Sequence, residues 1–180
     1  MERIFLIGYM GVGKTTLGKG LADSLNLSFV DLDLFTQSRY QKSINQLFDE
    51  FGEEGFREIE SKILKEVSDF EDVVISTGGG APCFYDNMEI MNERGKTIYL
   101  KADAGMLAKR LEQCKDKRPL LRDKTEEELY TFVSSNIEKR ESFYLKAHYV
   151  YNVGLIDKED IEKYAAFLIE KLNLQKRIII

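Results

Sequence analysis

Short apolar runs alternate with amphipathic stretches along most of the chain. Five runs that are apolar or rich in β-forming side chains predict strands at residues 3–7, 27–30, 73–75, 97–100 and 149–153. Between them, apolar positions at helical spacing predict helices over residues 14–25, 86–93 and 103–114. Strands that alternate with helices in this way predict an α/β domain built on a parallel sheet.

Two capping boxes predict further helices. Each places a hydroxyl side chain three positions before Gln or Glu: Ser43 with Gln46, and Thr125 with Glu128. The first of these helices should stop at Gly52, before a longer helix that continues to about residue 67. The second should run to about residue 147, and a final helix should cover residues 158–173.

Composition and charge narrow the class of protein. The chain has 180 residues, 43% of them hydrophobic and 32% charged, which suits one globular domain over residues 1–180. No apolar run approaches the roughly 20 residues of a membrane span, so we expect no membrane contact. Two cysteines and one histidine argue against a disulfide framework and favour a cytoplasmic protein with reduced thiols. A net charge of −5 without an arginine-rich tract argues against nucleic-acid binding.

The clearest motif is a phosphate-binding loop. Residues 8–15 read GYMGVGKT, which fits G-x-x-x-x-G-K-[ST] between a predicted strand and a predicted helix. Glycines let successive backbone N–H groups point at phosphate oxygens, and the following helix N-terminus adds partial positive charge. Lys14 can reach the β- and γ-phosphates, and the Thr15 hydroxyl can bind Mg²⁺. The motif predicts nucleotide binding, but it does not separate kinases from GTPases or ATPases.

Two further clusters follow predicted strands, at the edge where α/β sheets bind ligands. Asp31 and Asp33 follow the second strand, and in an extended segment their side chains would project to the same side. One carboxylate near Mg²⁺ and one near an acceptor hydroxyl would suit phosphoryl transfer, although Asp33 could instead cap the next helix. The GGG run at residues 78–80 follows the third strand and indicates positive φ or close approach of the backbone to a ligand, with a tight turn as the alternative.

Taken together, five motifs resemble the shikimate kinase family in order and spacing from about residue 3 to residue 153. They are GYMGVGKTT (8–16), DLD (31–33), GEEGFREIE (52–60), STGGG (76–80) and RPLL (118–121). The resemblance implies a P-loop kinase fold of the nucleoside-monophosphate-kinase type, with a five-stranded parallel sheet of order 2-3-1-4-5 flanked by helices. It also implies substrate-binding helices at about residues 33–62 and a lid at about residues 112–125.

The activity that the resemblance implies is transfer of the γ-phosphoryl group of ATP to the 3-hydroxyl of shikimate, in the biosynthesis of chorismate and the aromatic amino acids. We expect the enzyme to act as a monomer. The implied catalytic residues are Lys14, Asp33 as candidate base, and Arg118 in the lid. ATP would be held by Gly11, Val12, Gly13, Lys14, Thr15, Thr16, Arg110 and Arg118. Mg²⁺ would be held by Thr15 and Asp31, and shikimate by Asp33, Arg57, Gly78, Gly79, Gly80 and Arg140.

Arg57 and Arg140 would grip the substrate carboxylate, because guanidinium pairs with carboxylate through two parallel hydrogen bonds. Each arginine also has a simpler interpretation. Arg57 could pair with Glu53 and Glu60 on its own helix, and Arg140 could be a solvated helix residue. Arg118 could likewise be ordinary loop charge.

One departure from the family concerns adenine. The family often places an arginine over adenine shortly after the last strand, and residues 154–157 contain none. We therefore expect a lid residue such as Arg110 to contact adenine instead.

Two other functions compete with this one. A kinase of the same fold acting on gluconate or a nucleoside monophosphate is disfavoured by the pairing of DLD with the GGG run. A nucleotide-dependent switch is disfavoured because the sequence lacks an N/T-K-x-D base-specificity motif.

Overall fold

The computed structural model describes residues 1–113, 121, 123–154 and 160–174. Five strands form one parallel sheet of order β2-β3-β1-β4-β5: β1 (Arg3–Ile7), β2 (Ser28–Asp31), β3 (Val73–Ser76), β4 (Lys96–Lys101) and β5 (Tyr149–Asn152). The strand order implied by the family resemblance is confirmed. The helices are α1 (Lys14–Leu25), α2 (Leu32–Tyr40), α3 (Ile44–Val67), α4 (Asn87–Arg94), α5 (Ala104–Glu112), α6 (Glu126–Tyr144) and α7 (Ile161–Lys171), with a short 3₁₀ helix η1 (Ala81–Cys83).

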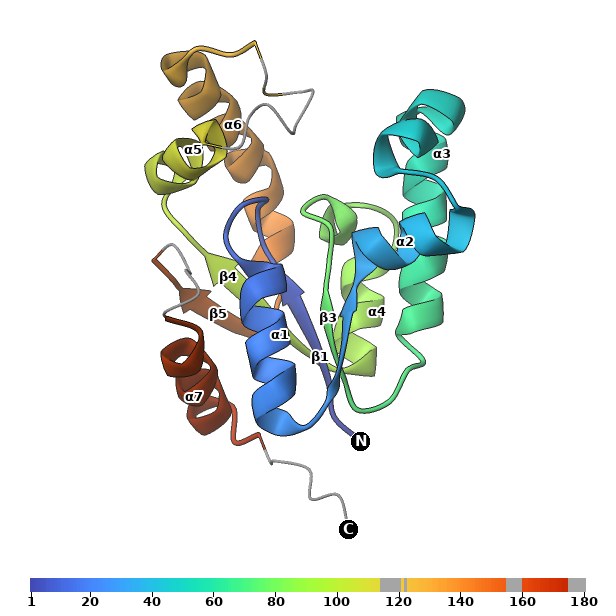
Figure 1. The fold of residues 1–180 in the computed structure, drawn as a ribbon, viewed down its shortest axis with the longest axis vertical. Coiled ribbons are helices and arrows are strands. Elements are labelled where there is room, and N and C mark those ends of the chain that lie inside the picture. The colour runs from blue at the N-terminus through green and yellow to red at the C-terminus, as the bar shows by residue number, and fades with distance from the viewer. Residues whose placement is uncertain (114–120, 122, 155–159, 175–180) are drawn as a thin grey trace.

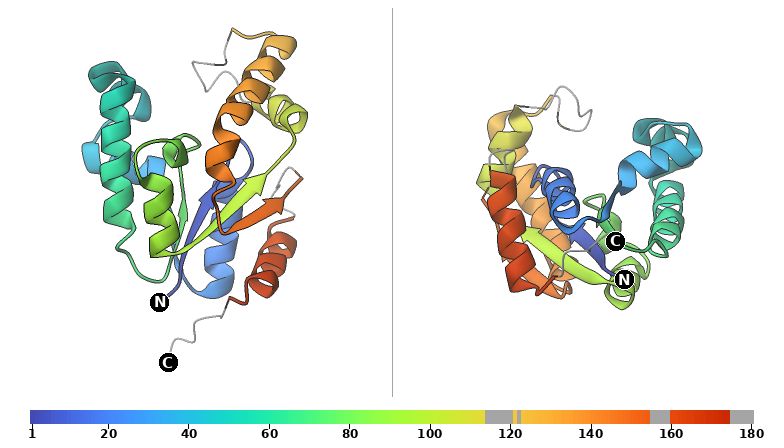
Figure 2. Two further views of the ribbon diagram at one scale, coloured as in Figure 1. Left: turned by 180° about the vertical axis from the view of Figure 1, so that it is seen from behind. Right: turned by 60° about the horizontal axis from the view of Figure 1, so that its bottom comes forward.

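The sheet is covered on both faces, which explains why its central strands are continuously apolar. Alternate side chains of β1 enter two different cores. Ile4 and Leu6 pack with the apolar faces of α1 and α7, which cover one side of the sheet (Figure 1). Phe5 and Ile7 pack on the opposite side, where α4 and α6 lie (Figure 2). All four side chains are fully buried, so β1 anchors the loop that follows it.

Two pairs of helices rise beyond the carboxyl ends of the strands, α5 with α6 on one side and α2 with α3 on the other (Figure 1). Both predicted capping boxes are confirmed. The Ser43 hydroxyl accepts from Gln46 N at 3.2 Å, and the Thr125 hydroxyl accepts from Glu128 N at 3.2 Å. The predicted stop at Gly52 is confirmed as a break inside α3, where the backbone is non-helical with φ 68° and ψ −177°.

The end of β2 differs from the sequence prediction. Asp31 is the last residue of the strand, whereas Asp33 already lies in the first turn of α2. The prediction that both aspartates share an extended segment is therefore wrong, and so is the alternative that Asp33 caps the helix. Asp31 is the cap: its Oδ1 accepts from Asp33 N at 3.1 Å and from Leu34 N at 3.2 Å. The change occurs because a carboxylate at this position satisfies two helix N–H groups that have no partner within the helix.

Other element ends shift by a few residues. α6 ends at Tyr144, earlier than the predicted end near residue 147, because the chain tightens there into hydrogen bonds spanning three residues, such as Ala147 N to Tyr144 O. The predicted end of the helix at 103–114 and the predicted start of the last helix at residue 158 lie outside the described residues. Among the helices described, none has the length and apolar character needed to cross a membrane.

Candidate active site

The loop between β1 and α1 curls around the amine of Lys14. Gly8, Gly11 and Gly13 have φ values of 139°, 85° and 104°, in the region that favours glycine. The Lys14 Nζ donates to Gly8 O at 2.8 Å and to Tyr9 O at 3.0 Å, and the side chain is buried. The lysine therefore lies directly beside the loop whose backbone N–H groups are expected to hold phosphate.

The head of α1 is tied to the end of β2 through oxygen atoms. The Thr15 hydroxyl donates to Asp31 Oδ2 at 2.7 Å, while the other oxygen of Asp31 caps α2. Among the described residues no group of three or more His, Cys, Asp or Glu side chains could hold a metal ion. A Thr–Asp pair nevertheless fits Mg²⁺, which prefers oxygen ligands, keeps several waters and usually takes only one or two protein carboxylates together with substrate phosphates.

The three glycines after β3 make room for the polar groups of the site. At Gly78, a Cβ atom would lie 2.6 Å from Glu60 Oε1 and 3.0 Å from Asp33 Oδ1. At Gly79 it would lie 3.3 Å from Met10 N and 3.7 Å from Arg140 Nη1. At Gly80 it would lie 2.7 Å from both Nη atoms of Arg57. None of the three glycines has a positive φ. The GGG run is therefore explained by close approach of side chains and backbone, and not by positive φ or by a turn alone.

Replacing one of these glycines should damage acceptor binding. In Gly80→Ala, the new methyl group would displace the Arg57 guanidinium, and a misplacement of about 1 Å can cost on the order of 10² in kcat/KM. Steady-state assays should show this loss for the acceptor substrate with little change in the KM for the nucleotide. Gly154→Ala is the matched control, because its Cβ would make ordinary contacts of 3.5 Å and 3.9 Å. Equal activity of the two variants would contradict the close-approach explanation.

Arg57 lies inside the protein on α3. Its side chain pairs with both glutamates considered in the sequence analysis: Nη1 donates to Glu60 Oε2 at 2.7 Å, and Nη2 lies 3.6 Å from Glu53 Oε1. Arg57 is 9% exposed, so it is a buried residue even though it forms both ion pairs. Burial raises the pKa of the Glu60 carboxyl, and the charge of Arg57 opposes that rise.

Glu60 was not among the predicted site residues. It is 2% exposed, and its Oε1 lies beside Gly78 while its Oε2 accepts from Arg57. The signal that could have identified it was its position three residues after Arg57, which is the spacing of neighbours on one helix face.

Arg140 approaches the same glycine loop from α6. It is partly buried, and its guanidinium carbon lies 5.5 Å from the centroid of the Tyr9 ring. One turn later, the fully buried Tyr144 donates its hydroxyl proton to Gly79 O at 2.5 Å. Burial raises the pKa of Tyr144, which keeps the hydroxyl protonated as a donor. Tyr144 was also not among the predicted site residues; its spacing of four from Arg140 places both on one helix face.

The structure thus brings most of the predicted site residues to one edge of the sheet. Lys14, Thr15 and Asp31 lie on the side of the phosphate loop, and Asp33, Arg57 and Arg140 lie around the 78–80 loop. Val12 belongs to the phosphate loop and Thr16 to the first turn of α1.

Of the two predicted lid arginines, only Arg110 is described. It lies in the last turn of α5, next to Leu111, whose Cδ2 would be 3.2 Å from a Cβ at Gly11. α5 therefore packs against the phosphate loop immediately before the predicted lid. Arg118 and most of the lid at 112–125 lie outside the described residues.

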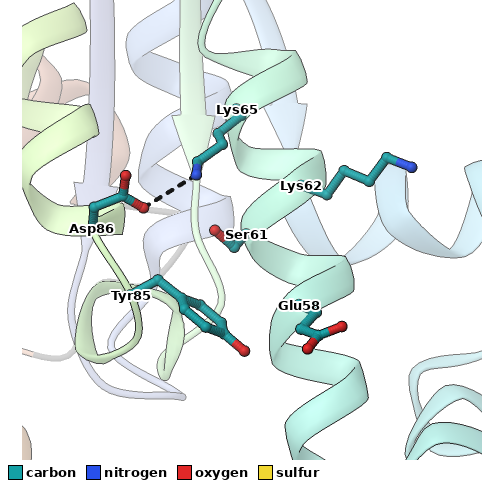
Figure 3. A pocket seen from close by; sticks show the side chains of 6 residues that line it. All are labelled: Glu58, Ser61, Lys62, Lys65, Tyr85 and Asp86. Atoms are coloured by element: carbon teal, nitrogen blue, oxygen red, sulfur yellow. Dashed lines mark ion pairs between the residues drawn. The ribbon is translucent and has the colours of Figure 1, made fainter.

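Two hollows on the described surface lie away from these residues. One of about 310 Å³ lies on α3 beside the loop before α4 and is lined by Glu58, Ser61, Lys62, Lys65, Tyr85 and Asp86 (Figure 3). Another, of about 580 Å³, lies between α5 and α6. None of the predicted site residues lines either hollow, so neither is assigned to the candidate active site.

A five-stranded parallel sheet of this order, with a phosphate loop after its central strand and polar side chains of α2, α3 and α6 around the 78–80 loop, defines a P-loop kinase. Residues 10–172 match the family model described as shikimate kinase. The shikimate kinases of Bacteroides thetaiotaomicron and Parabacteroides distasonis are each 51% identical to the chain, over 97% and 96% of it and over 100% of their own lengths. The chain belongs to the shikimate kinase family.

Solved structures agree with this assignment. The crystal structure of shikimate kinase from Bacteroides thetaiotaomicron has a TM-score of 0.92 at 51% identity, covering 96% of this chain and 99% of that one. A shikimate kinase from Acinetobacter baumannii in complex with shikimate has a TM-score of 0.84 at 29% identity, covering 96% and 93%. A gluconokinase from Sinorhizobium meliloti has a TM-score of 0.57 at 15% identity, which shows a shared fold alone.

Proposed function

We propose that the chain transfers the γ-phosphoryl group of ATP to the 3-hydroxyl of shikimate, giving shikimate 3-phosphate and ADP. Family membership carries the kinase activity and the use of ATP and shikimate. The observation that supports the arrangement of reacting groups is the 78–80 loop. Gly79 lies against the backbone of the phosphate loop, while Gly78 and Gly80 lie against Asp33 and Arg57. The phosphate loop, on the side of the phosphoryl donor, and Asp33 and Arg57, on the side of the acceptor, therefore lie against the same short segment, residues 78–80.

On the donor side, the phosphate-loop N–H groups and Lys14 bind the phosphates and stabilise the charge that develops during transfer. Thr15 and Asp31 would hold Mg²⁺. When bound, the ion would supply positive charge that offsets the charge of the phosphates. Arg110, at the end of α5, and Arg118, in the lid at about 112–125, contact the nucleotide, and closing of the lid excludes water.

On the acceptor side, Asp33 accepts the proton of the attacking hydroxyl. Its carboxylate is exposed, and its Oδ1 lies beside Gly78, so a bound acceptor can reach it. Arg57 and Arg140 bind the carboxylate of shikimate, while the backbone of residues 78–80 supports its ring substituents. The proposal includes a monomeric enzyme of the cytoplasm.

An acceptor panel tests this function. ADP release should be rapid with shikimate and close to background with gluconate, a nucleoside monophosphate or no acceptor. Faster ADP release with gluconate or with the nucleoside monophosphate would identify that acceptor, and not shikimate, as the substrate. Release that needs no acceptor would instead favour a nucleotide-hydrolysing switch.

Asp33→Asn should lower kcat by about 10²–10⁴, which is the usual contribution of a general base, and leave the affinity for ATP unchanged. The amide keeps the shape of the carboxylate but neither its charge nor its basicity. Steady-state kinetics and calorimetric titration with an ATP analogue would separate the two effects. A kcat within a few-fold of wild type would exclude Asp33 as the base.

Asp31→Asn should raise the Mg²⁺ concentration needed for half-maximal activity, because a neutral amide is a poorer ligand for the ion. The matched control is Asp103→Asn. Asp103 caps α5 in the same way, accepting from Gly105 N at 2.9 Å and from Met106 N at 3.1 Å. A change in Mg²⁺ dependence in both variants would point to lost helix capping. If Mg²⁺ rescued Asp33→Asn and not Asp31→Asn, the roles of the two aspartates would be reversed.

A further inference from the structure

Three phenylalanine rings surround the guanidinium group of Arg57. The guanidinium carbon lies 4.4 Å from the ring centroid of Phe84, 5.3 Å from that of Phe56 and 5.7 Å from that of Phe48. Phe48 and Phe56 both belong to α3, and their rings stack at 4.1 Å with an interplanar angle of 26°. Phe84 comes from the loop between η1 and α4, so it is the one ring of the three that closes on Arg57 from a different element.

The rings matter because Arg57 is 9% exposed, so that solvent and hydrogen bonds do little to stabilise its charge. Its Nη1 donates to Glu60, and its Nε is buried without a hydrogen-bond partner among the described residues. A cation within about 6 Å of an aromatic centroid is attracted by the negative face of the ring, and more strongly where water is excluded. The nearest ring, that of Phe84, should therefore provide the largest share of this attraction.

The backbone beside Phe84 is specially shaped. Phe84 is extended, with φ −120° and ψ 147°, whereas Tyr85 has a φ of 50°, a left-handed conformation that non-glycine residues rarely adopt. The Tyr85 side chain is 56% exposed and lines the hollow beside α3 (Figure 3), while the Phe84 side chain lies over Arg57. The turn therefore sends two adjacent aromatic side chains to different places. Unfavourable backbone geometry of this kind persists where the surrounding structure holds it and tends to cluster near functional sites.

We propose that Phe84 is a positioning residue for carboxylate recognition: its ring holds the guanidinium of Arg57 in a fixed plane, ready to bind the substrate carboxylate. The inference rests on the proposed function, in which Arg57 binds that carboxylate. Phe84 does not itself bind substrate or phosphate. Its loss should therefore affect shikimate binding far more than ATP binding or the chemical step.

The test compares Phe84→Leu with Phe84→Tyr. Leucine fills much of the space without an aromatic face, and we expect it to raise the KM for shikimate roughly tenfold, within the range of a partly desolvated cation–π contact. The kcat and the KM for ATP should stay within about threefold of wild type, because Phe84 does not itself bind substrate or phosphate. Tyrosine keeps the ring and should restore the KM for shikimate to within about twofold. Phe84→Met provides a second aliphatic variant if the leucine variant folds poorly, as judged by thermal melting.

Phe70→Leu is the matched control, because Phe70 is 36% exposed and packs on Phe35, outside the three rings. Its KM for shikimate should not change. An unchanged KM in Phe84→Leu and Phe84→Met, with an active wild type, would overturn the inference and leave the proposed function intact. Equal impairment of the leucine and tyrosine variants, or a parallel loss of ATP affinity, would also overturn it by indicating general packing. A wild-type enzyme that is inactive on shikimate would contradict both the inference about Phe84 and the proposed function.

Discussion

Wild-type enzyme should prefer shikimate over its neutral methyl ester by about 10⁴ in kcat/KM, because a site built around a polar group discriminates on this scale against analogues that lack it. Burial raises the pKa of the Glu60 carboxyl, and it raises the pKa of the Cys83 thiol to about 11. The positive charges of Arg57 and Arg140 oppose both rises, so the two arginines act on the same region of the site. Two cations near one pocket repel each other unless an anion lies between them. Glu60 and Glu53 already offset part of the Arg57 charge, and the substrate carboxylate would supply a further anion shared with Arg140.

Arg57→Ala should remove most of this preference for the acid. Competition between acid and ester, measured as kcat/KM in wild type and variant, is the appropriate assay. Arg39→Ala is a matched control, because Arg39 is an exposed arginine on α2 that pairs with Glu66 at 3.2 Å. Similar rates for acid and ester in the wild type would mean that the carboxylate is not what the site recognises.

Lys14→Ala should lower kcat by on the order of 10² or more through the loss of electrostatic stabilisation of the transferring phosphoryl group. The amine is buried and hydrogen-bonded to two carbonyls of the phosphate loop, so circular dichroism should accompany the kinetics to show that the fold is intact. Lys19→Ala provides the control, since Lys19 is an exposed lysine on the same helix, near the Phe29 ring. A Lys14→Ala variant within a few-fold of wild type would contradict the assignment of the phosphate loop.

Much of the fold could be predicted because local patterns and global architecture agree. The capping boxes at Ser43 and Thr125 form as expected, and the central strand at residues 3–7 was predicted with its observed ends, because continuous apolar runs are typical of buried parallel strands. The sheet order itself did not follow from these patterns and came from the family resemblance.

Other features depend on long-range packing that spacing does not reveal. Asp31 caps α2 because the helix begins at Leu32, directly after β2, so that the extended segment expected through Asp33 does not exist. The GGG run could be recognised as unusual from the sequence. Its reason could not, because the groups that fill the space beside it come from helices near residues 33, 57–60 and 140 and from the phosphate loop. The ring of Phe84 on Arg57 is likewise a contact between separate elements.

The most direct test of the central claim is to identify the product of the wild-type reaction. With ATP, Mg²⁺ and shikimate, ADP should form in a one-to-one ratio with consumed shikimate, and phosphorus–proton NMR should place the new phosphate on the oxygen at carbon 3. Transfer to another hydroxyl, or ADP release without loss of shikimate, would contradict the account.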